Sequence, residues 1–150
     1  MSTLKSTLYQ QCLTFIQNRI ENIEYSIRQA RQASNDDTKS SAGDKYETTR
    51  EMMQQEMDRN SKLLYEAGQQ KIALQQIENV EAAHEVKNGS LVLTPSGNFY
   101  ISISAGELKV EGKTFFAVSQ AAPIGRLFIG KKAGDELSFN GKKYLIEEIL

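Results

Sequence analysis

The sequence predicts an α+β fold, in which an N-terminal antiparallel coiled-coil hairpin precedes a small antiparallel β domain with one short helix. Residues 4–33 contain neither Gly nor Pro, and after Gly89 the hydrophobic period changes to two. Eleven of the twelve glutamines lie in residues 1–80, whereas eight of the ten glycines and both prolines lie in residues 81–150. We therefore expect two modules, a hairpin at 1–80 and a β-rich domain at 81–150.

The composition excludes several classes of protein. Hydrophobic residues make up 39% and charged residues 25% of the 150 residues, which excludes a disordered chain. No apolar run approaches the roughly 20 residues that span a bilayer, and the start lacks the apolar core of a secretory signal. We therefore expect a cytoplasmic protein with no membrane contact. A net charge of −1 argues against direct, sequence-specific nucleic-acid binding.

The first helix carries a narrow apolar stripe. Its members are spaced alternately four and three residues apart: Tyr9, Leu13, Ile16, Ile20, Ile23, Ile27 and Ala30. This spacing is typical of a coiled-coil seam. An amphipathic helix packed on a globular core is the alternative interpretation.

A polar segment, residues 34–45, separates this helix from the next. Its Ser, Asn, Asp, Thr and Gly residues favour turns, so we expect it to form the tip of the hairpin. Asp44 has the character of an N-cap, with Glu47 three residues later. The second helix is then expected to run to about Val80, with a weaker seam through Tyr46, Met53, Met57, Leu64, Ala67 and Leu74.

The C-terminal half has the pattern of short strands joined by turns. Strands are expected at 90–94, 98–104, 107–110, 113–119, 137–139 and 142–149, and Asn140-Gly141 suits a type I′ turn. A short helix at 123–129 begins with Pro123 and is expected to place Ile124, Leu127 and Phe128 toward the sheet.

Residues 117–149 resemble the C-terminal domain of the GreA/GreB family of bacterial transcript-cleavage factors. The resemblance lies in Val118-Ser119, Ala122-Pro123-Ile124-Gly125-Arg126, Gly130-Lys131-Lys132-Ala133-Gly134-Asp135 and the closing strand from Tyr144 to Ile149. Ala122 stands where the family commonly has Ser. The resemblance implies an FKBP-like fold for this domain, and the order of the two modules is also that of the family.

Members of this family bind RNA polymerase beside its secondary channel. The resemblance implies that the C-terminal domain holds the channel rim and that the coiled coil enters the channel as a monomer. It assigns partner binding to Ser119, Pro123, Ile124, Gly125, Arg126, Lys131 and Lys132. Such a protein is not itself an enzyme and binds no cofactor tightly. It stimulates cleavage of backtracked RNA by helping to hold a Mg²⁺ ion shared with the polymerase active site.

The acidic residues available for that role are Asp36, Asp37 and Asp44, with Mg²⁺ expected at Asp36 and Asp37. Aligning the family's tip tyrosine with Tyr46 places Lys39 and Ala42 at the family's acidic positions, and neither side chain can bind a metal. Three alternatives therefore stay open. The protein is a Gre-like channel binder without cleavage activity, a coiled-coil scaffold unrelated to transcription, or a prolyl isomerase. The absence of Trp counts against the last.

Overall fold

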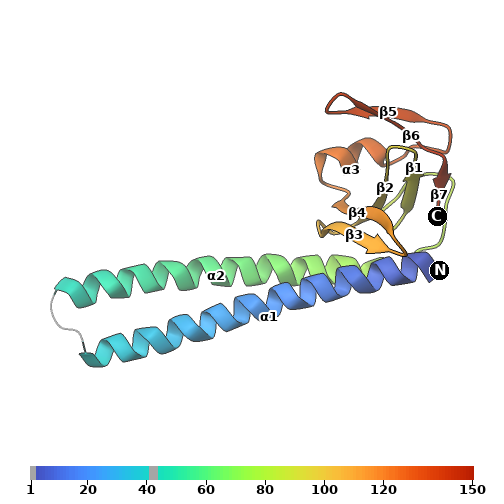
Figure 1. Ribbon diagram of the computed structural model, residues 1–150. Coiled ribbons are helices and arrows are strands. Elements are labelled where there is room, and N and C mark those ends of the chain that lie inside the picture. The colour runs from blue at the N-terminus through green and yellow to red at the C-terminus, as the bar shows by residue number, and fades with distance from the viewer. Residues whose placement is uncertain (1–2, 41–43) are drawn as a thin grey trace. The chain divides into compact units, whose positions relative to one another are not determined.

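The structure is a computed structural model that describes residues 3–40 and 44–150, with side chains described outside 34–40 and 44–46. Helices α1 (Thr3–Ser40) and α2 (Asp44–Gln76) precede a β region that contains the short helix α3 (Pro123–Phe128) (Figure 1). Contacts divide the chain into two compact units. One is Ile16–Gln70, and the other combines Met1–Phe15 with Lys71–Leu150. The α+β class predicted from the sequence is confirmed.

Within the unit Ile16–Gln70, α1 and α2 lie side by side and form a coiled-coil-like hairpin (Figure 1). The predicted seam is its buried stripe. Ile16 and Ala67 are buried, and the other described seam residues of this unit are half-buried: Ile20, Ile23, Ile27, Ala30, Met53, Met57 and Leu64. Asn60 is also buried in α2, and its Nδ2 atom has no hydrogen-bond partner among the described residues.

The first helix is longer than predicted. We expected it to end at residue 33, but α1 continues to Ser40, and α2 begins at Asp44. Ser, Asn and Asp each lower helix propensity by less than about 0.7 kcal/mol, which is too little to end a long helix. The sequence contains no Gly or Pro in this region before Gly43. Asp36 and Asp37 therefore lie within the backbone span of α1 rather than in a turn.

The β region contains a five-stranded and a two-stranded sheet. The larger has the strand order β3-β4-β2-β1-β7 and the smaller pairs β5 with β6. The strands are β1 (Leu91–Thr94), β2 (Gly97–Ser102), β3 (Gly106–Val110), β4 (Lys113–Ser119), β5 (Glu136–Phe139), β6 (Lys142–Leu145) and β7 (Glu148–Ile149). The single closing strand predicted at 142–149 is thus divided, and β7 leaves β6 to pair with β1.

The sheet is mainly antiparallel, as predicted, but it contains one parallel pair of strands. β2 and β4 are parallel, with Phe99 opposite Phe116 and Ile101 opposite Val118. β3 pairs with β4 but not with β2, so β4 lies between them and runs in the same direction as β2. The alternation of side chains along a strand does not show which strand it pairs with, so the sequence does not indicate this parallel pair.

One face of the large sheet carries the main hydrophobic core. The core contains Val86, Val92, Phe99, Ile101, Phe128, Leu137, Tyr144 and Ile146, with Ile124 and Val118 packed against it. Three aromatic rings meet within it: the Phe99 centroid lies 4.9 Å from that of Phe128 and 5.4 Å from that of Tyr144. The Phe116 ring lies 5.7 Å from Phe99, but Phe116 is 37% exposed and is not part of the buried cluster. This core fixes α3 on the sheet.

The first residues of α1 belong to the same compact unit as the sheet. The Gln11 side chain donates a hydrogen bond to the Lys109 carbonyl oxygen (2.9 Å), and Cys12 Sγ lies 3.7 Å from Ser102 Oγ. Lys5, only 2% exposed, donates to the carbonyl oxygen of Val80 (2.8 Å) and to that of Leu150 (3.2 Å). β2 is consequently buried on both faces, which explains why Tyr100 and Ile101 are both fully buried although they are adjacent in the strand.

Candidate partner-binding surface

The segment from Ser119 to Asp135 contains every residue to which we assigned partner binding. It begins at the end of β4, where the Ser119 carbonyl oxygen accepts a hydrogen bond from the Ala122 amide (3.0 Å). Ser119 Oγ accepts another from the Ala121 amide (3.1 Å). These bonds form a tight turn that leads into α3, with Pro123 at its first helical position. Ser119 therefore has a structural role in starting α3.

Gly125 is fixed by a close approach of two backbone segments. A Cβ atom at this position would lie 2.0 Å from the Ser119 carbonyl oxygen and 3.2 Å from the Gln120 Cα. A Cβ atom does not approach a non-bonded oxygen so closely, so any side chain would force α3 away from β4. Gly125 is buried, and because it has no side chain α3 can lie against the end of β4.

α3 divides its side chains between the core and the solvent. Phe128 is fully buried, and Ile124 packs against the core, as predicted. Leu127 was predicted to face the sheet, and this prediction is wrong because Leu127 is 39% exposed. Ile129, at 38%, and Arg126 are exposed as well. Because α3 has only six residues, the spacing of Ile124, Leu127 and Phe128 does not show which of them faces the core and which lies at its margin.

The loop after α3 is held by backbone hydrogen bonds to the segment that precedes β1. The Gly130 amide donates to the Val86 carbonyl (2.9 Å), and the Val86 amide donates to the Lys131 carbonyl (2.8 Å). The Lys132 amide donates to Asp135 Oδ2 (2.7 Å), and the Lys132 ammonium lies 3.8 Å from Glu85 Oε1. Lys131 is half-buried, whereas Lys132 is exposed.

We call five of the exposed apolar and basic residues of this segment the α3 surface: Pro123, Arg126, Leu127, Ile129 and Lys132. Its backbone is held by the hydrogen bonds at Ser119, by those to Val86 and by the packing of Phe128 in the core. Apolar groups beside Arg are typical of protein-binding surfaces. Leu127 and Ile129 are the residues that sequence reasoning missed, and only their adjacency to the motif residues could have indicated them.

The tip carboxylates lie elsewhere in the chain. Asp36 and Asp37 fall within α1 and Asp44 begins α2, but their side chains lie outside the described residues. Among the side chains that the structure describes, no three His, Cys, Asp or Glu residues come together as a metal-binding group. The Mg²⁺ expected at Asp36 and Asp37 stays a prediction.

A buried polar cluster between α1 and the sheet has the wrong chemistry for a reactive site. Burial raises the pKa of the Cys12 thiol to about 11, so the thiol stays protonated near neutral pH. Burial also raises the pKa of Tyr100, with smaller contributions from Cys12 and Tyr9. A protonated, fully buried thiol is a poor nucleophile, and we assign Cys12 a packing role.

The structure thus defines an α+β protein with a long helical hairpin and an exposed α3 surface. Across the part of the chain that it describes, no helix is both long enough and apolar enough to cross a membrane. Comparison with protein-family models gives no match for this chain, and comparison with curated proteins gives none either.

Proposed function

We propose that this protein binds bacterial RNA polymerase and regulates transcript elongation in the manner of the GreA/GreB family. In this proposal the C-terminal domain has an FKBP-like fold and holds the rim of the secondary channel through the α3 surface, while the hairpin enters the channel. The protein acts as a cytoplasmic monomer and has no catalytic activity of its own.

The observation that carries the proposal is the agreement between the motif and its local structure. The residues that resemble the family form one continuous segment from Ser119 to Asp135, in which the buried residues set the backbone and the exposed ones lie together along it. A long helical hairpin precedes the β region, in the family's order. A family resemblance in a buried segment alone would support only a shared fold.

The contribution of the α3 surface is tested by a matched pair of leucine substitutions. Leu127 and Leu145 are both exposed leucines of the β region, at 39% and 43%, but only Leu127 belongs to the α3 surface. We expect Leu127→Asp to weaken binding to core RNA polymerase by about tenfold or more, and Leu145→Asp to leave it unchanged. Equal affinities for the two variants would exclude the α3 surface as the contact, and equal losses would indicate a general effect on folding.

Whether the protein stimulates RNA cleavage depends on the tip. Lys39 and Ala42 occupy the positions that correspond to the family's acidic pair, so we favour channel binding without cleavage over cleavage stimulation. The test is RNA cleavage by a stalled, backtracked polymerase complex with the wild-type protein and with an Asp36/Asp37/Asp44 triple alanine variant. Cleavage above the polymerase-only rate that disappears in the variant would restore the stimulating role.

The scaffold alternative makes a different prediction about the seam. A self-associating coiled coil would use residues 9–30 to contact a second copy, but α2 already covers the seam residues of 16–30 within the chain. We therefore expect sedimentation equilibrium to give the monomer mass. A stable dimer that dissociates when Ile23 is replaced by Asn would favour the scaffold.

A further inference from the structure

The methionines of this protein are concentrated in one short stretch of α2. Three of the four lie within six consecutive residues, at Met52, Met53 and Met57. We call these three the methionine cluster. Neither polymerase binding nor the seam pattern requires methionine at all three positions, because leucine serves a helical seam equally well.

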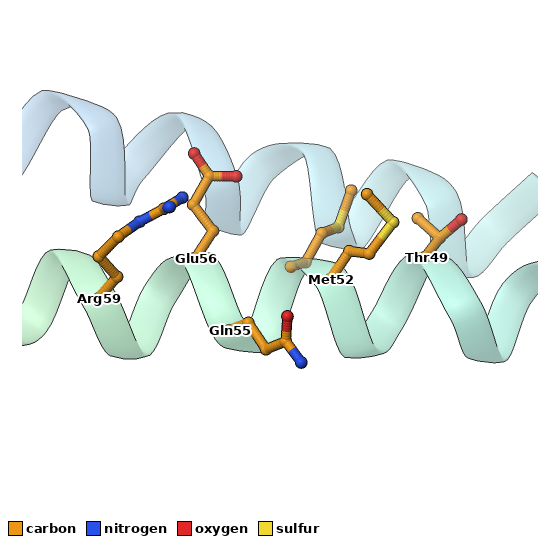
Figure 2. A pocket seen from close by; sticks show the side chains of 6 residues that line it. Thr49, Met52, Gln55, Glu56 and Arg59 are labelled. Carbon is orange, nitrogen blue, oxygen red and sulfur yellow. The ribbon is translucent and has the colours of Figure 1, made fainter.

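Their access to solvent is graded. Met52 is 65% exposed and lies in a shallow groove of the hairpin, lined by Thr49, Met52, Met53, Gln55, Glu56 and Arg59. Figure 2 shows Met52, Glu56 and Arg59 extending from α2 on the side of α1. Met53 and Met57 belong to the seam and are half-buried. The same thioether group is therefore present at one open and two partly protected positions within two helical turns.

Thioethers are the most accessible oxidisable sulfur in the described chain. The one cysteine, Cys12, is fully buried, and its thiol has a raised pKa, so little of the reactive thiolate forms. Methionine reacts as the neutral thioether and needs no deprotonation. A peroxide in solution therefore encounters Met52 well before it reaches Cys12.

We propose that the methionine cluster is an oxidation site through which peroxide weakens the packing of α1 against α2. The sulfur of each thioether attacks one oxygen of hydrogen peroxide, an S–O bond forms, and the O–O bond breaks. The sulfur is oxidised by two electrons, the peroxide is reduced, and the second oxygen leaves as water after proton transfer. The product is methionine sulfoxide, which is polar and is restored by sulfoxide reductases.

The effect of each sulfoxide follows from its position. At Met52 the new S=O group points into water and leaves the seam intact. At Met53 or Met57 it introduces a strong acceptor into a stripe of apolar side chains, where desolvation is unfavourable. Oxidation thus occurs in two stages, a structurally silent one at Met52 and a destabilising one in the seam.

The order of oxidation is measured by treating the full chain with hydrogen peroxide and quantifying each sulfoxide by peptide mass spectrometry over time. We expect Met52 to react several-fold faster than Met53 and Met57, and Cys12 to stay reduced while Met52 is converted. Equal rates at the three methionines, or oxidation of Cys12 first, would overturn the proposal.

The structural consequence is measured by thermal unfolding, followed by far-UV circular dichroism, before and after oxidation. We expect the fully oxidised wild type to unfold at a lower temperature and a methionine sulfoxide reductase to reverse the change. A Met53→Leu/Met57→Leu double variant should resist the loss, whereas Met52→Leu should not. An unchanged melting temperature after complete oxidation, or an equal loss in the double variant, would refute a role for the cluster in packing.

Discussion

Replacing Gly125 with Ala tests the close approach that shapes the α3 surface. A Cβ atom at Gly125 would lie 2.0 Å from the Ser119 carbonyl oxygen and 3.0 Å from its carbonyl carbon. Both atoms are backbone, so no side-chain rotation can relieve the overlap, and α3 or the end of β4 must move. Overpacking of this kind costs about 1–3 kcal/mol and occasionally more; we expect about 3 kcal/mol because the contact is with backbone.

Gly68→Ala is the matched control for this substitution. Gly68 lies inside α2, and a Cβ atom there would meet nothing within 4 Å. Because alanine has the higher helix propensity, we expect Gly68→Ala to raise stability by up to about 1 kcal/mol. The assay is guanidinium unfolding, followed by the near-UV phenylalanine signal, since five of the six phenylalanines lie in the β region, and by far-UV circular dichroism for the helices. A Gly125→Ala variant as stable as the wild type would refute the close approach of α3 to β4.

Three further substitutions test buried polar groups. Burial raises the pKa of Cys12 from 9.0 to about 11, so the folded state keeps a proton that the unfolded state releases. The stabilisation from the protonated thiol is complete below about pH 9 and is lost as pH rises through about 11. At pH 10 we expect the free energy of unfolding to be about 1.4 kcal/mol lower than below pH 9. Urea titrations of the Cys12→Ala variant should not show this decrease. The Tyr100 hydroxyl is fully buried with no partner among the described residues, so Tyr100→Phe should unfold at an equal or higher urea concentration. A free energy of unfolding more than about 1 kcal/mol below that of the wild type would mean that the Tyr100 hydroxyl has a hydrogen-bond partner. Asn60→Leu should raise the melting temperature of the hairpin by removing a buried amide nitrogen that has no partner among the described residues. A lower melting temperature would show that Asn60 fixes the pairing of α1 with α2.

The helices and most strands could be predicted because each leaves a local signal. The four-and-three spacing of the α1 seam and the alternation of β2 depend only on which side chains are buried, and β4 has the predicted bounds, 113–119. Strand order carries no such signal. The sequence around Phe99 and Phe116 does not reveal that they lie on adjacent parallel strands. Their pairing arises because β3 lies at the edge of the sheet and β4 lies next to β2.

The candidate surface was predicted as a motif but not as a set of exposed groups. Gly125 and Ile124 were grouped with Arg126 because they are adjacent in the motif, yet the structure buries Gly125 and packs Ile124 on the core. Leu127 was assigned to the core from its spacing and is exposed instead. Sequence reasoning also gave no indication that the start of α1 would cover the second face of the sheet. The bonds of Gln11 and Lys5 join residues too far apart in the chain for any local pattern to reveal them.

The central claim is that this protein binds RNA polymerase, and the most direct measurement is its affinity for bacterial core enzyme. Fluorescence anisotropy of the protein, labelled at an added terminal cysteine in a Cys12→Ala background, reports binding without requiring any effect on transcription. We predict saturable binding with a dissociation constant in the micromolar range or tighter, competed by unlabelled wild type and only weakly by Leu127→Asp. No binding at micromolar concentrations of both partners would contradict the proposed function.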